Sequence, residues 1–476
     1  MIVKPSKLEY ARQVFGCTGM IITCDGKRHL GAALGSNVFK ESYVADLVAS
    51  WISELEVLSD FGESDPHSAY SAFIHGFSHK WQYFQRTIEG ISHLFAPLEQ
   101  VIRSRFIPSI IGRQISDEER KLLSFPCRLG GLGIPIPSET AVSSYSDSRE
   151  ISEPMVALIK EQSLYCPDKL TTDIQLLKSS CVKRKDEQLL SAVQEFTASL
   201  SESSKRLLEL NSERGSSTWL TSLPLAECGY HLNRQQFHDS LSLRYGWSIP
   251  GMAQYCACGH KNSPNHALIC RLGGFVIMRH NELRDTEAEL LNTVCKDVTV
   301  EPQLIKLKRQ EIEAMPNSAI VSDDARLDIS ALGFWNPMQK TFLDVRVFHA
   351  NADSYKNKPP ASLYKLHENQ KKSAYNKRVI DIEHGTFSPL IFSTTGGMGS
   401  ECLKYHKQLA QLISQKKGER YMDVMNFIRL RLRFCLLRSS LIAIRGTRKN
   451  VRRAPSPKPI DDLDIGLIHD YCSNLL

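Results

Sequence analysis

Residues 325–348 read ARLDISALGFWNPMQKTFLDVRVF, and this stretch decides the fold of the carboxyl half of the chain. It contains two strand-like apolar runs joined by a Gly/Asn/Pro turn, and each run carries one aspartate, Asp328 in the first and Asp344 in the second. An aspartate among Leu, Ile, Val and Phe is costly unless its charge is met, and two on neighbouring strands can meet a shared cation. The sequence therefore predicts a β-turn-β unit that holds a pair of carboxylates.

The two carboxylates suit a hard divalent cation. Mg²⁺ prefers carboxylate oxygens, keeps several of its waters and bridges to substrate phosphate, and a water bound to it can attack phosphorus. Arg346 lies two residues after Asp344 and therefore on the same strand face. We accordingly predict a Mg²⁺ site that cleaves phosphodiesters. The alternative is that both aspartates are ordinary surface carboxylates at strand ends.

Further candidates for this site come from the segments before and after the two strands. The segment KLHENQKKSAY is predicted to be helical and contributes four candidate side chains, Lys365, Lys371, Lys372 and Tyr375. One of these lysines is expected to reach the carboxylates. A third acid that would help to hold the cation is expected from Glu301 in VTVEP, or from Glu282 or Glu287 on the preceding helix.

Working outward from these strands, hydrophobic periodicity predicts an α/β domain. The expected elements are a helix at 280–295, strands at 298–304, 325–333 and 341–348, a helix at 361–381, a strand at 388–393, and helices at 400–416 and 420–444.

A cysteine and histidine cluster precedes this domain. Cys256, Cys258, His266 and Cys270 are spaced C-x-C-x7-H-x3-C, which is short enough to wrap one tetrahedral Zn²⁺. His260 competes for the fourth position, and His266 is favoured because it leads into the short helical turn that ends at Cys270. The alternative is ordinary buried cysteines. Because all four ligands come from protein, the predicted role is to hold the fold or to present a loop to nucleic acid.

A basic run follows near the carboxyl end. Residues 429–453 carry nine Arg or Lys and no acid, interleaved with apolar residues. The pattern favours a phosphate-contacting surface over a merely solvated helix face. The candidate nucleic-acid contacts are Arg429, Arg431, Arg433, Arg438, Arg445 and Arg448.

The front half is predicted to be largely helical. Residues 17–36 are expected to form a short strand pair that turns at Asp25-Gly26, and helices are expected from Glu41 onwards. A first helical domain is expected to end near residue 150. The thirteen scattered cysteines favour reduced thiols over a disulfide framework. No apolar run reaches 18 residues and no basic-then-apolar leader is present, so neither membrane insertion nor secretion is expected.

Taken in order, these motifs resemble a known family. The zinc-type spacing, RHNELRD, VTVEP, ARLDIS, FLDVRVF, KLHENQKKSAY and FSPLIFSTTGGMG are similar to the zinc knuckle and restriction-like endonuclease that end the polyprotein of LINE-like (non-LTR) retrotransposons. In the front half, IVKPSKLEYARQVF, ITCDGKRHLGAALGS and YSAFIHGFSHKWQYFQRTI resemble the region after the polymerase active site of the same elements, including its primer-grip and thumb segments.

The resemblance implies a mixed fold, with a helical reverse-transcriptase thumb/connection region, a zinc knuckle and an α/β restriction-endonuclease-like domain. It implies the following domains: 1–36, residual palm and primer grip; 37–150, thumb-like; 151–250, helical linker; 251–272, CCHC zinc knuckle; 273–448, endonuclease; 449–476, unstructured tail.

The function implied is that of a PD-(D/E)xK nuclease that nicks target DNA, leaving a 3′ hydroxyl that primes reverse transcription of the element RNA. Asp328 matches the first acid of that motif and Asp344 the second. The implied partners are DNA target and element RNA, with no membrane and no small-molecule substrate. The implied location is the nucleus, after a cytoplasmic ribonucleoprotein stage.

The sequence departs from the motif at two positions. Leu327 stands where the motif has Pro, and Arg346 stands at its lysine position. Arginine can stabilise charge but is a poor proton donor or acceptor, so we expect the lysine role to have moved to the following helix, with Lys372 preferred.

The polymerase centre is missing. That family needs an aromatic-x-Asp-Asp hairpin, whereas the Asp-Asp pairs here are Asp323-Asp324, in a polar loop, and Asp461-Asp462, in the tail. We therefore expect no polymerase activity and a fragmentary reading frame. The alternatives to an active nuclease are a catalytically inactive nucleic-acid-binding remnant and a host protein built from retroelement parts.

Overall fold

The structure is a computed structural model, and it describes residues 1–164 and 166–446. The chain divides into two compact units, Met1–Ser201 and a second one that starts at Glu202. The molecule is mostly helical with a small mixed sheet. Within the described residues, no helix is both long and apolar enough to cross a membrane. Arg448, one of the predicted nucleic-acid contacts, lies outside the described residues.

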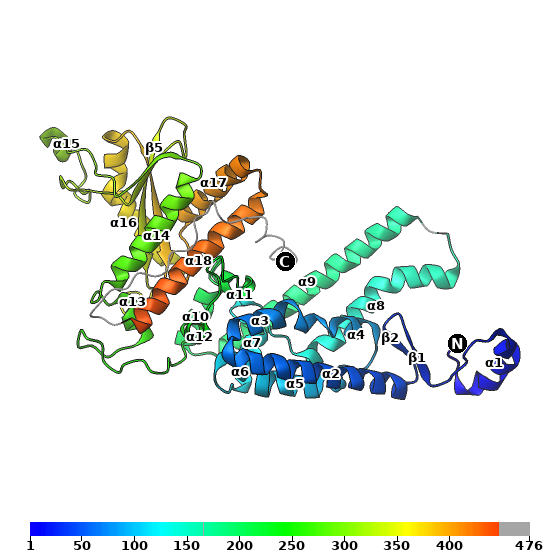
Figure 1. Cartoon of the computed structure of the whole chain (residues 1–476). Coiled ribbons are helices and arrows are strands. Elements are labelled where there is room, and N and C mark those ends of the chain that lie inside the picture. Colours follow the sequence, from blue (N-terminus) through cyan, green and yellow to red (C-terminus); the bar gives the residue numbers. More distant parts are fainter. Residues whose placement is uncertain (165, 447–476) are drawn as a thin grey trace. The chain divides into compact units, whose positions relative to one another are not determined.

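The first unit is a helical assembly with one small hairpin (Figure 1). Its core is aromatic: Trp51 packs against Trp81 and Phe95, and the rings of Phe73 and Phe106 stack with centroids 4.4 Å apart. Its elements are α1 (Leu8–Phe15), β1 (Gly26–His29), β2 (Ala32–Gly35), α2 (Asn37–Ser64), α3 (Pro66–His75), α4 (Gln82–Thr87), α5 (Ala96–Val101), α6 (Ile107–Ile111), α7 (Asp117–Ser124), α8 (Pro137–Glu161) and α9 (Pro167–Ser199).

The hairpin turns five residues later than its sequence suggested. β1 and β2 pair antiparallel around Leu30 and Gly31, not around Asp25-Gly26. Both turn residues have positive φ, at 48° and 85°, and a two-residue turn of this kind matches the twist of the flanking strands. Asp25-Gly26 instead lies at the entrance to the hairpin, where the Asp25 carbonyl accepts a hydrogen bond from Ser36 N.

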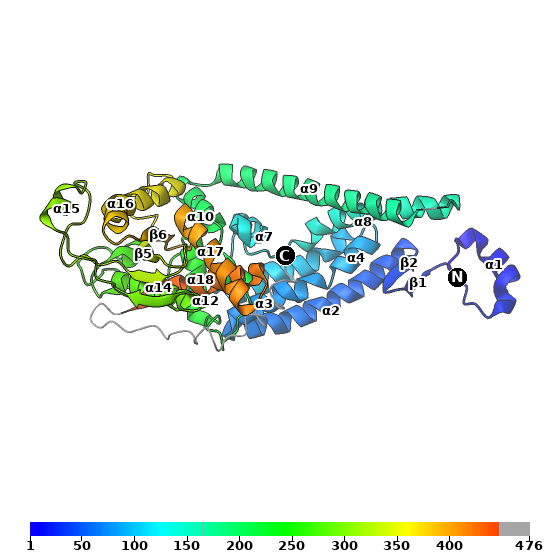
Figure 2. The same cartoon turned by 90° about the horizontal axis from the view of Figure 1, so that it is seen from above.

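Two long helices, α8 and α9, follow the core of the first unit and pack against each other along part of their length (Figure 2). α8 runs without interruption through the expected domain end at residue 150. The region 151–250, expected to be one helical linker, is divided between the two units, because the division falls at Ser201.

The second unit is built on a four-stranded sheet of order β3-β4-β5-β6. β3–β4 and β4–β5 are antiparallel, whereas β5 and β6 are parallel and are joined through α16. Its elements are α10 (Glu202–Ser212), α11 (Thr218–Thr221), α12 (Arg234–Tyr245), α13 (Pro264–Ile269), α14 (Phe275–Asn292), β3 (Lys296–Val300), α15 (Arg309–Glu313), β4 (Ile329–Leu332), β5 (Lys340–Phe348), α16 (Pro360–Asp381), β6 (Thr386–Ser393), α17 (Ser400–Lys417) and α18 (Tyr421–Arg445).

Helices cover both faces of this sheet (Figure 1). On one face, Phe348 of β5 and Ile391 of β6 pack against Leu363 and Tyr364 of α16. On the other face, β6 packs against α17, and α14 contacts β3, β4 and β5. α18 packs behind them against α14 and α17. The predicted α/β elements are thus present, with bounds within a few residues of those expected, because strand and helix periodicity act locally.

Candidate functional site

Asp328 and Asp344 come together on the sheet. Ile329 of β4 pairs with Leu343 of β5, and Asp328, directly before β4, donates its backbone N–H to Leu343 O at 3.1 Å. The negative charge of Asp328 acts on Asp344, so the two carboxylates lie near each other. Asp328 Oδ2 accepts a hydrogen bond of 2.6 Å from Val345 N, which ties the first carboxylate to the strand that carries the second.

A lysine of α16 reaches this pair. Lys371 Nζ lies 2.5 Å from Asp344 Oδ2, and the Asp344 side chain is 6% exposed. Burial raises the pKa of Asp344 to about 6, which Lys371 opposes and the negative charge of Asp328 reinforces. Tyr375, one helical turn after Lys371, lies with its ring centroid 5.8 Å from the ammonium. Burial and the two aspartates raise the pKa of Tyr375 to about 12, so it stays a neutral phenol.

A histidine of α14 completes the arrangement. His280 Nε2 lies 3.2 Å from Asp328 Oδ2 and 3.1 Å from the carbonyl oxygen of Val345, so a proton on Nε2 is donated toward both acceptors. Burial acts to lower the pKa of His280, but the hydrogen bond and charge of Asp328 outweigh it and the pKa is raised. His280 therefore orients Asp328. Its segment, RHNELRD, was part of the resemblance, but nothing local in the sequence singled out this residue.

The connection that leads into Asp328 is anchored by a buried arginine. Arg378 of α16 is 0% exposed and donates 2.7 Å to Ile320 O and 2.8 Å to Ile305 O. Both carbonyls belong to the long connection between β3 and β4, which contains α15. Arg378 thereby holds this connection against α16, and so fixes where the chain begins β4.

Other predicted site residues lie elsewhere. Lys372 Nζ pairs with Glu401 Oε1 at 2.6 Å, so the lysine beside the carboxylates is Lys371 and the preference for Lys372 is corrected. Arg346 Nη1 donates 3.1 Å to Gln370 Oε1 on α16. Lys365 is exposed. A helix turns 100° per residue, so neighbouring lysines leave α16 in different directions, and the sequence could not choose between them.

Two of the residues expected to supply a third acid pair with other groups instead. Glu301 Oε1 accepts 2.5 Å from Arg284 Nη1, and its other oxygen lies 3.6 Å from Arg326, so its charge is met by two arginines. Glu287 is fully buried against His406 Nε2 at 2.8 Å, on the α17 side of the sheet. The carboxylate that pairs with Lys371 is Asp344, and the charge of Asp328 acts on the same carboxylate.

The zinc-type cluster is gathered as its spacing predicted. The ligand atoms of Cys256, Cys258, His266 and Cys270 all lie within 4.8 Å of one another. Cys256 Sγ and Cys270 Sγ are 3.8 Å apart, and Cys258 Sγ is 3.2 Å from His266 Nε2. Two sulfurs bound to one tetrahedral zinc at about 2.3 Å lie about 3.8 Å apart, so the spacing fits this metal.

His260 stays at the edge of this cluster. Its Nδ1 is 3.5 Å from Cys258 Sγ, and its ring stacks on that of His266. His266 is held in place by α13, whose N-terminal Ser263 side chain accepts a hydrogen bond from His266 N. The short helical turn therefore selects His266 for the group of four, as its position before Cys270 suggested.

Four arginines of α18 are engaged inside the second unit and do not form the open phosphate-contacting surface that their charge pattern predicted. Arg431 is 2% exposed and pairs with Glu289 at 2.5 Å, and Arg433 Nε donates 2.9 Å to Ser216 O. Arg438 donates to two backbone carbonyls, and Arg445 makes two hydrogen bonds of 2.7 Å to Asp239.

Arg429 is half-buried, and burial together with the charge of Arg214 lowers its pKa. The charge pattern could not predict these contacts, because a run of like charges does not show where the opposite charges and carbonyls lie. For α18 these partners come from residues 216–289, far away in sequence.

The carboxylate pair fits a divalent cation. Two carboxylates lie close together in a mostly buried site, one with a raised pKa, and a cation between them would offset both the desolvation and the mutual repulsion. Compared with known proteins, the sequence matches no protein-family model and no curated protein.

Proposed function

We propose that this protein is a metal-dependent DNA endonuclease whose active centre is formed by Asp328, Asp344 and Lys371. The observation that carries the proposal is the convergence of the two carboxylates with the Lys371 ammonium, 2.5 Å from Asp344, at one point of a sheet covered by helices. Two carboxylates that can hold a divalent cation, with a basic group beside them, are suited to the hydrolysis of a phosphodiester. The resemblance to non-LTR retrotransposon endonucleases supports DNA as the substrate.

Each residue has a distinct role in this proposal. Asp328 and Asp344 would hold Mg²⁺, which when bound supplies a nucleophilic water at neutral pH and neutralises charge on the phosphate. Lys371 carries a positive charge to the same point and stabilises the negative charge that develops on the phosphoryl oxygens. His280 acts as a positioning residue, because its hydrogen bond fixes the orientation of Asp328.

Under the same proposal, the cysteine and histidine cluster binds a structural Zn²⁺ that stabilises residues 251–272 next to the nuclease fold. Nicked DNA with a 3′ hydroxyl would be the product, used as a primer for copying element RNA, and the nucleus would be the site of action. Reverse transcription is not part of the proposed activity.

The test is plasmid nicking by the full-length protein with Mg²⁺, beside Asp344→Asn and the control Asp381→Asn. Asp381 is an exposed carboxylate on α16 that pairs with Lys377. Nicking should fall about 10²–10³-fold in Asp344→Asn, since loss of metal stabilisation costs several kcal/mol. It should persist in Asp381→Asn and stop with a chelator. If wild type and Asp344→Asn both bind the plasmid and leave it supercoiled, the protein is a binding remnant.

A further inference from the structure

Accessible positive charge lies beside the carboxylate pair, on β5 and in the connection from β5 to α16. Arg346 of β5 is partly exposed, and Lys358 of the connection is exposed. Proteins bind a DNA backbone chiefly through Lys and Arg side chains at its phosphates. Four arginines of α18 have partners inside the second unit, so a DNA strand needs cationic contacts elsewhere.

Arg346 shares a strand face with Asp344. Alternate residues of a strand point to the same side, and two residues span about 7 Å. The pairing of β5 with β6 is regular through both positions, since Asp344 pairs with Pro389 and Arg346 with Ile391. An arginine one step along the strand from the proposed metal site is placed to contact the phosphate next to the one that the metal holds.

A neutral amide supports Arg346 without removing its charge. Arg346 Nη1 donates 3.1 Å to Gln370 Oε1, on the residue before Lys371 in α16. Arg346 Nε and Nη2 have no hydrogen-bond partner, and the guanidinium forms no ion pair, within residues 1–164 and 166–446. Neither nitrogen is an enclosed atom. The charge of Arg346 is therefore oriented but not neutralised, and its remaining N–H donors reach solvent.

The orientation of Gln370 is fixed from its other side by His367. This side chain is fully buried, and its ring lies against the rings of Phe348 and Tyr355. His367 Nε2 has no hydrogen-bond partner in the described part of the chain, whereas Nδ1 lies 3.3 Å from Gln370 Oε1. A neutral ring therefore carries its proton on Nδ1 and donates it to Gln370. Since Gln370 Oε1 then accepts two hydrogen bonds, the NH2 group of this exposed side chain is left to donate outward.

The electrostatic environment of His367 shows that positive charges gather on the α16 side of the sheet. Burial and the charge of Arg346 lower the pKa of His367 to about 4, and Lys371 and Lys358 act in the same direction. The imidazole is therefore neutral at neutral pH, and three cations act on it. Lys371 is already paired with Asp344, which leaves the charges of Arg346 and Lys358 for a ligand.

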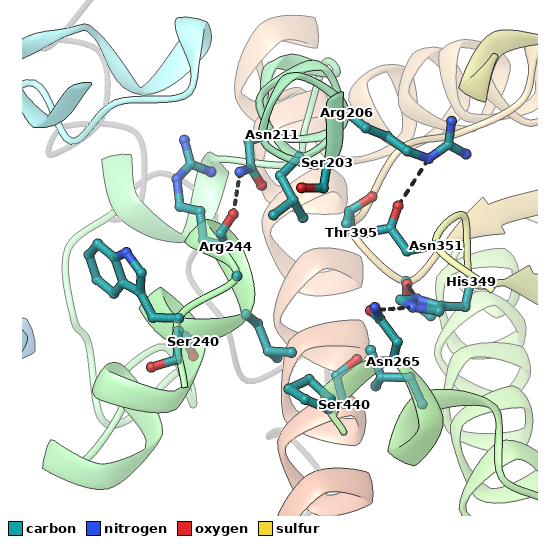
Figure 3. A pocket seen from close by; sticks show the side chains of 18 of the residues that line it. Ser203, Arg206, Asn211, Ser240, Arg244, Asn265, His349, Asn351, Thr395 and Ser440 are labelled. Atoms are coloured by element: carbon teal, nitrogen blue, oxygen red, sulfur yellow. Dashed lines mark hydrogen bonds between the residues drawn. The ribbon is translucent and has the colours of Figure 1, made fainter. Parts of the chain in front are cut away.

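The backbone of Lys358 is held in place while its side chain stays accessible. Arg206 of α10 anchors the connection from β5 to α16, because its Nε donates 3.0 Å to Asn351 Oδ1 (Figure 3) and its Nη1 donates 2.7 Å to Lys358 O. Lys358 N donates 2.9 Å to Tyr355 O. The Lys358 side chain is exposed and forms no ion pair with any residue that the structure describes.

The acids that are close in sequence to these two cations are engaged with other groups. Glu368 of α16 is buried and accepts hydrogen bonds from Ser400 Oγ at 3.0 Å and from Glu401 N at 2.9 Å, at the start of α17. Asp353 of the connection pairs with Lys356 at 3.2 Å. The surface beside the carboxylate pair therefore keeps a net positive charge, unlike α18.

We propose that Arg346 and Lys358 bind backbone phosphates of the DNA strand whose phosphodiester lies at Asp344. Arg346 holds the phosphate next to the cleaved one, because its planar fork of N–H donors matches phosphate oxygens, and the NH2 group of Gln370 adds a donor. Lys358 holds a phosphate further along the same strand as a point charge. The substrate is accordingly a strand that continues past the cleaved bond. This inference rests on the proposed nuclease, which defines the cleaved phosphate.

DNA affinity as a function of salt tests the proposal. The probe is a fluorescein-labelled DNA duplex, and its anisotropy is measured with the full-length protein without Mg²⁺. Arg346→Gln should raise the Kd about tenfold, since one charge-assisted hydrogen bond contributes about that factor. It should also lower the slope of log Kd against log salt by about 0.9, the value for one phosphate contact. Lys358→Gln should lower the slope equally and raise the Kd about threefold, as expected for an exposed ion pair.

Two further variants separate phosphate binding from other effects. Lys377→Gln is the matched control, because Lys377 lies on α16 but is already paired with Asp381 at 2.6 Å. Its Kd should stay within about twofold of wild type, with an unchanged slope. Arg346→Lys keeps the charge and loses the fork, so it should restore the slope and recover only part of the affinity. A purely structural role of Arg346 would change the affinity without changing the slope.

Wild-type Kd and salt slope in both Arg346→Gln and Lys358→Gln would overturn the proposal. The Lys358 variant gives an answer even if Arg346→Gln fails to fold, because only the backbone of Lys358 is bonded to other residues. Nicking distinguishes this failure from failure of the nuclease. A protein that nicks plasmid while both slopes stay at the wild-type value is a nuclease that holds its strand elsewhere. A protein that leaves plasmid supercoiled, with a lowered slope in both variants, keeps the phosphate contacts and lacks the nuclease activity.

Discussion

The strand pair β4–β5 and the helix α18 both mix charged residues with apolar ones, yet they use the charges differently. On the strands, Asp328 and Asp344 are brought to one point, where Lys371 meets them. On α18, Arg431, Arg438 and Arg445 follow one another at intervals of about two helical turns, and each has its own partner. Convergent charges can hold a ligand, whereas dispersed and individually paired charges hold the fold. Charge content alone does not distinguish the two.

Removing the metal from the zinc-type cluster should have the largest effect of the changes considered, because one metal ion would join all four ligand atoms. Structural zinc contributes on the order of 10 kcal/mol to the folding of small zinc domains. We expect about one zinc per chain, and we expect chelation to abolish amide-exchange protection over residues 251–272. Cys258→Ser should lose the metal, whereas Cys17→Ser, at an exposed cysteine of the first unit, should keep it. Purified protein free of metal would contradict the assignment.

The two adjacent lysines of α16 give a sharper version of the comparison. Lys371→Met removes the ammonium beside Asp344 and should lower nicking about 10²–10³-fold, since a preorganised charge at the reacting centre contributes that much. Lys372→Met removes the partner of Glu401 and should stay within about twofold of wild type, because surface pairs contribute little. Equal losses in both variants, measured as single-turnover nicking rates, would contradict the assignment of Lys371.

The smallest effect concerns the dispersed arginines. Arg445→Ala leaves Asp239, whose side chain is 3% exposed, without its bidentate partner, and should lower the free energy of unfolding by about 2–3 kcal/mol. Arg309→Ala, at a side chain 93% exposed, should change it by less than about 0.5 kcal/mol. Urea unfolding followed by tryptophan fluorescence measures both.

DNA affinity at fixed salt provides the second measurement on Arg445→Ala. Since this arginine is already bonded to Asp239 and to Pro250 O, the folded variant should bind DNA within about twofold of wild type. A large loss of affinity with unchanged stability would instead restore α18 as a phosphate-contacting surface.

The sequence by itself determined the strands of the second unit, most of the helices around them and the identity of the paired aspartates. Strand and helix periods are local properties, so β5, α16 and β6 begin and end within about two residues of the predicted bounds. The cysteine and histidine cluster was equally readable, because its four ligands lie within a short segment that a turn and one helical turn can close. Asp328 and Asp344 stood out because a charge inside an apolar strand is exceptional.

The tertiary structure decided everything that depends on partners distant in sequence. It selected Lys371 over Lys372, added His280 from another helix and turned the α18 arginines inward toward Ser216, Glu289 and Asp239. The direction of a side chain follows from the helix or strand that carries it. The group that it contacts follows from how the helices and strands pack, and the local sequence pattern does not specify that packing.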